Sequence, residues 1–354
     1  GEMFLSLLVS CVLQVPDITH IDAHVQRSSE GFTSVFDVAE MDDGRVLLTD
    51  NRDRAIFIVD FSAPSVTPLG REGEGPKEYR SAFSILPQPH GRFLVYDTSL
   101  RRFLVVADDG TIEGTEPFNP PPLNSFSAPR GPDREGYLYL SHREVSPDGL
   151  APDAILYKWH PEKEDLQQIG TFSNYAPGQQ GTGFVPMPRE DAWTVQPDGR
   201  VGKLVAEDYH WEWMDGPVSP PVDFPKIRVG EEEREAWLDE VYSRSAGGSS
   251  SFRGGASSSA TRRPVDPGRF PRFVPPFKGE YLPAAPWGEV WVKVDVLSDP
   301  TLTVFDIFDG EGHHLRRVSL DGDARVVGFG SSVVYIARKD EYGLEWLERI
   351  TPVP

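Results

Sequence analysis

Short apolar runs that end in aspartate alternate with charged or glycine-containing turns in the first third of the chain. Residues 42–50 read DDGRVLLTD, and residues 51–60 follow with NRDRAIFIVD. The arrangement returns as HGRFLVYD at residues 90–97 and as TSLRRFLVVAD at residues 98–108. Two short β-type runs joined by a turn are typical of a β-hairpin. The pattern therefore predicts two pairs of antiparallel strands, in which the aspartates bind backbone groups of nearby turns.

The hairpin pattern recurs along the whole chain, and a glycine marks each recurrence. Successive glycines are 47, 45, 63, 89 and 42 residues apart, so the spacing stays at 42–47 outside two expansions. They are Gly44, Gly91, Gly136, Gly199, Gly288 and Gly330. A repeat of about 40–50 residues that is rich in short strands is typical of β-propeller blades. A single blade cannot bury both of its faces, so the six predicted blades must pack in a ring.

One further β-type run precedes the first full repeat. It reads IDAHVQR and occupies residues 21–27. We expect it to complete the last blade, whose hairpin ends near Ile350, because this closure hides strand edges that could otherwise aggregate. The predicted fold is all-β: a six-bladed β-propeller over residues 18–352, closed by an N-terminal strand and carrying a short helical insertion. The 33 glycines and 33 prolines of the chain agree with many turns and little helix.

The repeats resemble those of bacterial six-bladed β-propeller proteins related to NHL-repeat propellers. The resemblance covers roughly residues 18–352. It is carried by DGRVLLTD with RAIFIVD, by GREGEGPKEYR, by PDGRV with DYHWEWMD, by PPFKGEYLPAAPWGEVWV and by the closing GFGSSVVYIARKDEYGLEWLERI. A propeller fold hosts enzymes, receptors and scaffolds alike, so the resemblance identifies the fold better than the function.

The run GREGEGPKE at residues 70–78 invites two interpretations. As a phosphate loop it fails, because Pro76 stands where lysine is needed and Glu78 stands where serine or threonine would bind magnesium. The resemblance instead identifies the run as a linker between the outer strand of one blade and the inner strand of the next. It implies that the glycines adopt backbone angles closed to other residues and that Tyr79 packs between blades. The structural linker residues are Gly70, Gly73, Gly75, Pro76 and Tyr79, and a Gly75→Val change is expected to damage folding.

The larger expansion of the repeat contains an insertion at residues 225–275. Residues 230–245 read GEEEREAWLDEVYSRS, and their apolar positions recur at helical spacing, which predicts a short amphipathic helix. Residues 245–264 have the composition of a flexible linker. This arm is basic and bears phenylalanines, so it is either a solvated loop or a contact for an acidic protein neighbour or a lipid headgroup. The predicted partner-binding residues are Trp237, Tyr242, Phe252, Arg253, Arg262, Arg263 and Arg269.

The first 17 residues form an apolar leader. Residues 3–15 are uncharged, and this run is shorter than the roughly 20 apolar residues that are needed to span a bilayer. The run LVSC at residues 8–11 resembles a bacterial lipobox and predicts a lipid anchor at Cys11. This implies a membrane-anchored protein of the periplasm or another extracytoplasmic space. The alternative is a buried N-terminal helix or strand with a chance cysteine. Because Cys11 is the single cysteine, no intrachain disulfide can form.

Charge and motif content exclude some functions. Lysine and arginine total 35 against 55 aspartates and glutamates, a net charge of -20, so the basic footprint of a nucleic-acid binder is missing. No G-x-S-x-G nucleophile motif occurs, and the eight histidines show no metal-ligand spacing. We therefore predict no catalytic residue, no metal and no cofactor from motifs. Some propeller lyases and lactonases bind zinc or calcium in the central channel through ligands from several blades, and such ligands would be distant in sequence.

Two functional hypotheses follow. The first is a non-enzymatic, membrane-tethered scaffold that binds other subunits of a membrane complex, for example a photosynthetic reaction-centre or light-harvesting assembly. The leader, the insertion and the missing catalytic motif favour it. The alternative is a periplasmic propeller enzyme, a lyase, lactonase or hydrolase, with its site at the mouth of the channel.

Overall fold

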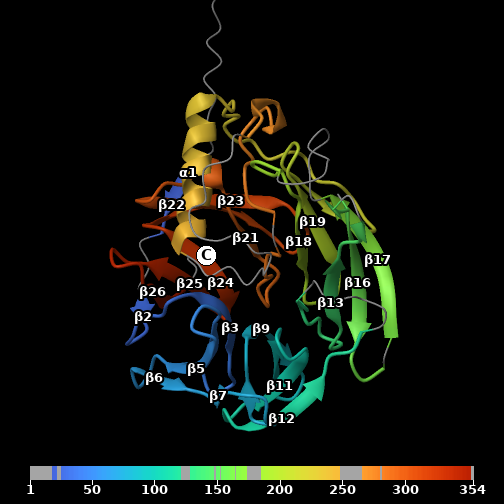
Figure 1. Ribbon diagram of the computed structural model, residues 1–354, viewed down its shortest axis with the longest axis vertical. Coiled ribbons are helices and arrows are strands. Elements are labelled where there is room, and N and C mark those ends of the chain that lie inside the picture. Colours follow the sequence, from blue (N-terminus) through green and yellow to red (C-terminus); the bar gives the residue numbers. More distant parts are fainter. Residues whose placement is uncertain are drawn as a thin grey trace, which may run out of the picture.

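Among the described residues, six sheets of three or four strands stand around a central axis, so the predicted six-bladed β-propeller is confirmed (Figure 1). The computed structural model describes residues 18–21, 25–120, 128–146, 149–151, 153–163, 165–173, 185–247, 265–279 and 281–351. Within these ranges, no helix is long and apolar enough to cross a membrane.

The first two blades are four-stranded antiparallel sheets that follow the predicted hairpins. Blade 1 consists of β3 (Val35–Glu40), β4 (Val46–Asp50), β5 (Ala55–Asp60) and β6 (Ser65–Pro68). Blade 2 consists of β9 (Ala82–Gln88), β10 (Arg92–Asp97), β11 (Arg102–Ala107) and β12 (Ile112–Pro117). Between them lie the short parallel strands β7 (Arg71–Glu72) and β8 (Glu78–Tyr79).

The described parts of blades 3 and 4 each contain three regular strands. Blade 3 has β13 (Leu138–His142), β16 (Asp153–His160) and β17 (Asp165–Ser173), with the small hairpin of β14 (Val145–Ser146) and β15 (Gly149–Leu150) beside it. Blade 4 has β18 (Ala192–Val195), β19 (Val201–Val205) and β20 (His210–Trp213). Residues around Arg130 take the innermost position in blade 3, since Arg130 forms an isolated bridge with Tyr139 of β13.

The N-terminal segment closes the ring. Blade 6 has β24 (Ala324–Phe329), β25 (Val334–Lys339) and β26 (Glu345–Ile350), and β2 (Gln26–Arg27) pairs with β26 as its outermost strand, as predicted. Blade 5 has β21 (Val290–Lys293), β22 (Leu302–Phe308) and β23 (His314–Asp321). An isolated antiparallel bridge joins Ala284 to Val290 at the start of β21. A second N-terminal strand, β1 (Ile18–His20), pairs in parallel with β23. The sequence pattern did not predict this second strand.

Aspartates at strand ends hold each blade to the segment that enters it. The Asp50 carboxylate accepts four backbone N–H groups, two from the segment before β3 and two from the turn after β4, at 2.9–3.0 Å. Asp97 accepts four N–H groups in the same way in blade 2, at 2.8–3.2 Å. Both carboxylates are buried. The predicted role of these aspartates as turn formers is therefore confirmed.

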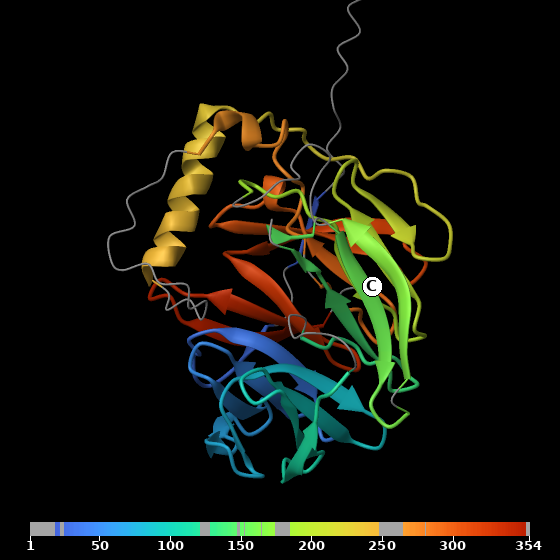
Figure 2. The ribbon, with the colours of Figure 1, turned by 45° about the vertical axis from the view of Figure 1, so that its right-hand side comes forward.

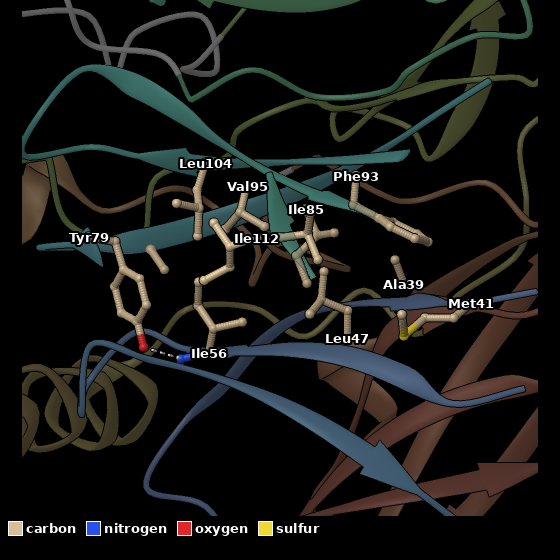
Figure 3. Packing of buried hydrophobic residues seen from close by; sticks show 12 residues of the cluster. Ala39, Met41, Leu47, Ile56, Tyr79, Ile85, Phe93, Val95, Leu104 and Ile112 are labelled. Atoms are coloured by element: carbon tan, nitrogen blue, oxygen red, sulfur yellow. Dashed lines mark hydrogen bonds between the residues drawn. The ribbon is translucent and has the colours of Figure 1, made fainter. Parts of the chain in front are cut away.

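Buried side chains of adjacent blades pack face to face. Figure 3 shows the cluster between blades 1 and 2, in which the Tyr79 hydroxyl accepts a hydrogen bond from the backbone N–H of Ile56 at 3.1 Å. The labelled residues of this cluster are Ala39, Met41, Leu47, Ile56, Tyr79, Ile85, Phe93, Val95, Leu104 and Ile112. Tyr79 thus joins the linker to blade 1 while the chain passes on to blade 2.

Glycine suits these linker positions for two different reasons. Gly70 has a φ of +70°, a left-handed conformation that favours glycine. Gly73 and Gly75 lie outside the left-handed region, contrary to expectation. They are close instead to the folded-back side chain of Glu78, whose Oε2 would lie 2.1 Å from a Cβ at Gly73 and 3.0 Å from one at Gly75. The Gly75 contact is with the flexible end of a side chain.

A Gly70→Val change is therefore expected to be more damaging than Gly75→Val. A Cβ at Gly70 would lie 2.9 Å from Ile112 Cδ1 and 3.1 Å from the Tyr79 ring. The left-handed backbone and this overpacking together predict a loss of about 2–4 kcal/mol in unfolding free energy. Gly75→Val is expected to cost about 1 kcal/mol. Urea unfolding of the two variants checks this order, and equal stability losses would contradict it.

The insertion carries helix α1 (Glu231–Gly247), close to the predicted range of 230–245. Figures 1 and 2 place α1 outside the ring, beside the orange and red strands of blades 5 and 6. Leu238 is buried, and the Trp237 ring meets the Phe270 ring edge-on at 5.8 Å. Two short 3-10 helices complete the elements, η1 (Pro267–Arg269) and η2 (Asp295–Leu297).

Candidate functional site

The central channel contains a cavity of about 920 Å³. Residues of all six blades line it, because the innermost segment of each blade runs along the channel. Four lining residues with ionisable side chains form one group, and the aromatic ring of Phe36 lies among them: Asp37, Arg130, Tyr281 and Arg325. None of them was singled out by sequence motifs.

Arg130 is fixed in place by its backbone and by aromatic rings. Its N–H and C=O groups both bond to Tyr139, at 2.9 Å each, which anchors it to blade 3. Its guanidinium carbon lies 5.6 Å from the ring centre of Phe36, 5.8 Å from that of Phe83 and 5.2 Å from that of Tyr281. These rings belong to blade 1, blade 2 and the segment entering blade 5. Cation–π attraction to three rings therefore holds the guanidinium within the channel.

The guanidinium N–H donors of Arg130 have no hydrogen-bond acceptor in the described part of the chain. A guanidinium offers five N–H donors, and buried or half-buried ones are normally paired. Within the described ranges, the Arg130 side chain makes the three ring contacts and neither a hydrogen bond nor an ion pair. Arg325, the other arginine near Asp37, donates to Glu345 Oε2 at 3.1 Å and to the carbonyl of Val35. Arg130 is therefore the arginine of this group that is free to bind an external anion.

Asp37 is a carboxyl group held close to these cations. Its oxygens accept the backbone N–H groups of Val38 and of Ile85, each at 2.9 Å, so that it links blades 1 and 2. Burial raises the pKa of Asp37 to about 6, against the opposing effect of the Arg130 and Arg325 charges and of the two backbone hydrogen bonds. Asp37 therefore changes its charge near neutral pH.

Tyr281 belongs to the same group, because its ring centre lies 5.2 Å from the Arg130 guanidinium carbon. Its ring meets Trp193 edge-on at 4.9 Å, and an isolated parallel bridge joins the backbones of these two residues. Burial raises the pKa of Tyr281 to about 12, although the nearby Arg130 charge lowers it. Its hydroxyl therefore stays protonated at neutral pH and can donate a hydrogen bond.

The cavity lining is cationic relative to the rest of the protein. It contains six lysines and arginines against five aspartates and glutamates, whereas the whole chain has a net charge of -20. The charges of Lys278, Lys293 and Lys339 act on Asp323, and Lys293 donates a hydrogen bond to it at 2.9 Å. Burial alone would raise the pKa of Asp323, but these lysines lower it below its usual value. An anion therefore meets less repulsion in the channel than at the outer surface.

The donor set does not suit a metal ion. In the part of the chain that the structure describes, no three histidine, cysteine, aspartate or glutamate side chains come together closely enough to hold one. The zinc or calcium site expected of some propeller enzymes thus finds no ligand set among these residues.

The sequence-predicted site residues whose side chains the structure describes do not line the channel cavity. Cys11, Phe252, Arg253, Arg262 and Arg263 fall outside the described residues, as does the side chain of Tyr242. Trp237 and Arg269 lie in α1 and η1 of the insertion. The linker residues Gly70, Gly73, Gly75, Pro76 and Tyr79 lie at the junction of blades 1 and 2.

One sequence signal could have found Arg130. Counting six residues back from each turn glycine gives an apolar residue in five repeats and Arg130 in the third. The five are Val38, Ile85, Trp193, Leu282 and Ala324. A charged residue at a position that is otherwise apolar is informative, because a buried charge needs a partner or a function.

Comparison with solved structures agrees with the fold. A DUF4221 family member from Bacteroides vulgatus matches with a TM-score of 0.55 and 10% identity, over 95% of this chain and 97% of that one. A gluconolactonase from Xanthomonas campestris matches with a TM-score of 0.52 and 12% identity, over 95% of this chain and 94% of that one. No family model matches the chain, and no curated protein matches its sequence. At such identities the likeness shows the shared propeller fold alone; the relation to NHL-repeat proteins stays a prediction.

Proposed function

We propose that this protein binds a small organic acid in its central channel, with the acid's carboxylate against Arg130. The observation that carries the proposal is a guanidinium held by three aromatic rings, with no acceptor among the described residues. A planar guanidinium matches a carboxylate with two parallel hydrogen bonds, and the match is stronger away from bulk water. A bound carboxylate would satisfy guanidinium donors that find no hydrogen-bond acceptor among the described residues.

Neighbouring groups support the choice of a carboxylic acid. The protonated Tyr281 hydroxyl, and Asp37 in its neutral form, can each donate a hydrogen bond to the same anion. The cavity of about 920 Å³ lies within the range of small-molecule sites. The Xanthomonas protein of the same fold is named a gluconolactonase, and hydrolysis of any lactone yields a hydroxy acid.

A second candidate function, ester or lactone hydrolysis, is favoured by Asp37. A carboxylate with a pKa of about 6 can take a proton from water near neutral pH. In this scheme the water oxygen attacks the carbonyl carbon, and Asp37 accepts the water proton. Arg130 stabilises the oxyanion. The carbon–oxygen bond then breaks, and Asp37 returns the proton to the leaving alkoxide, so that an acid and an alcohol form.

Binding of organic acids is tested by thermal unfolding and calorimetry of the full chain. We expect benzoate and hexanoate to raise the unfolding temperature and the matching amides, benzamide and hexanamide, to have no effect, because only the anions pair with Arg130. The absence of binding by every organic acid tried at millimolar concentration would contradict the proposal.

Affinity for a carboxylate is expected to fall as the pH rises through about 6. Below that value Asp37 is neutral and donates to the ligand, and above it the Asp37 charge repels the ligand. Because its folded pKa is raised above the unfolded value, Asp37 also reduces the stability of the free protein as the pH rises from about 4 to about 6. Asp37→Asn should remove both dependences. Calorimetry at pH 5 and pH 8 checks this, and an unchanged pH profile in the variant would contradict it.

The scaffold hypothesis is a separate proposal about other parts of the chain. It rests on the apolar leader with Cys11 and on the basic arm, and both lie largely outside the described residues. Membrane anchoring, an extracytoplasmic location and protein partners in a membrane complex, photosynthetic or other, therefore stand as sequence-based proposals. They are compatible with an acid-binding channel, because a tether and a ligand site occupy different parts of the chain.

A further inference from the structure

One end of the channel is lined by prolines. The cavity lining includes six of them, contributed by blades 2, 3, 4 and 5 near the turns between their inner strands: Pro87, Pro89, Pro132, Pro197, Pro283 and Pro286. We call this set the proline ring. Proline has no backbone N–H, so the backbone of this wall offers few hydrogen-bond donors to a ligand.

Aromatic side chains continue the apolar wall beyond the proline ring. Phe329 also lines the cavity, and its ring meets that of Trp287 edge-on at 5.8 Å. Trp287 is 40% exposed, which is high for a tryptophan and places an apolar surface at this rim. The acid at this end, Asp133, is not free, because it accepts the Tyr139 hydroxyl at 2.8 Å and pairs with Lys158 at 3.3 Å.

The anion-binding group borders the proline ring directly, because Arg130 lies two residues before Pro132. In β24, Arg325 lies at the end shared with Asp37 and Phe329 lies four residues further on. At a strand rise of about 3.3 Å per residue, these positions are about 13 Å apart along the channel. The apolar wall therefore begins beside Arg130 at the proline ring and continues to Phe329.

We propose that the ligand is an amphipathic monocarboxylic acid, with its carboxylate at Arg130 and an apolar body that extends along the proline ring to Phe329. The proposal rests on the proposed function and adds the class of ligand. A polyhydroxy acid such as gluconate fits poorly, because its hydroxyl groups would leave water without hydrogen-bond partners at the proline ring. An alkyl or aryl body instead gains free energy from leaving water there.

The test is a series of straight-chain carboxylates from butanoate to decanoate, titrated by calorimetry into the full-length protein. Each added methylene is expected to lower Kd about fourfold until the tail reaches Phe329. Gluconate should bind more weakly than hexanoate. A Kd that is independent of chain length, with butanoate still bound, would overturn this inference and leave the proposed function standing.

Two variants and one neutral probe separate the contributions. Phe329→Glu should weaken octanoate at least tenfold and leave butanoate within a factor of two, because only the longer tail reaches the new charge. Leu315→Glu, the same change at an exposed leucine of β23, is the matched control and should alter neither. If Phe329→Glu left octanoate binding unchanged, the apolar wall would be misassigned. If 1-octanol bound as tightly as octanoate, the carboxylate site at Arg130 would be refuted instead.

Discussion

An Asp306→Ala change is expected to lower the free energy of unfolding by about 3–5 kcal/mol, the largest loss that we predict for a single substitution in this protein. Asp306 lies fully buried in β22, where it pairs with Arg317 of the neighbouring strand. The Arg317 Nε and Nη2 atoms donate to its two oxygens at 2.7 and 2.8 Å. Arg317 is itself only 1% exposed.

Two further donors attach this pair to its surroundings. The Tyr209 hydroxyl of blade 4 donates to Asp306 Oδ2 at 2.6 Å, and His314 Nε2 lies 2.8 Å from Oδ1. Burial acts to raise the pKa of Asp306, but the hydrogen bonds of His314 and Arg317 and the Arg317 charge hold it below the usual range. Loss of the carboxylate would leave the Arg317 charge and the Tyr209 hydroxyl buried without this partner, which explains the size of the effect.

Asp309→Ala is the matched control, because it removes a carboxylate from the turn that follows the same strand. Asp309 accepts the backbone N–H groups of Glu311 and His313 at 2.9 Å near the surface, so its removal should cost about 1 kcal/mol. Equilibrium unfolding in urea measures both losses. If Asp306→Ala cost no more than Asp309→Ala, the buried pair would not stabilise the junction of blades 4 and 5.

The second large effect concerns the channel. Arg130→Gln is expected to raise the Kd for a carboxylate about 30- to 150-fold, the equivalent of about 2–3 kcal/mol, because a charge-assisted pair is lost. Stability should change by about 1 kcal/mol or less, since the lost cation–π contacts are offset by removal of an unpaired charge. A strong loss of binding with little loss of stability would mark Arg130 as a ligand group.

Arg134→Gln provides the control for Arg130→Gln. Arg134 also lines the cavity and lies only four residues away, but it is exposed near the turn of the blade, and no ring of the described residues encloses it. The same loss of charge there should change Kd less than threefold. Calorimetric titration with hexanoate measures both variants. Equal losses would indicate a general effect of charge and not a specific site.

The fold followed from the sequence because each blade repeats a local pattern. Turn glycines, apolar runs and the capping aspartates Asp50 and Asp97 all act within about 20 residues of one another, so a single sequence is enough to predict what they do. Strand β2 was predicted for the same reason, since a ring with one incomplete blade needs an outer strand. Strand β1 was missed because three exposed residues that pair in parallel leave no apolar alternation.

The channel site could not be read in this way because its parts come from different blades. Asp37, Arg130 and Tyr281 are separated by 93 and 151 residues, and none belongs to a motif. Only closure of the ring brings them together. The run GREGEGPKE shows the reverse case: its glycines suggested a binding loop, but Gly70 serves a left-handed turn and Gly73 makes room for Glu78.

A crystal structure of the protein with 6-bromohexanoate tests the acid-binding channel most directly. We predict electron density for the carboxylate within hydrogen-bond distance of the Arg130 guanidinium, with the anomalous signal of bromine on the side of the proline ring. An empty channel at a saturating concentration of the acid, or bromine found only at the outer surface, would contradict the assignment of Arg130 as the anion-binding residue.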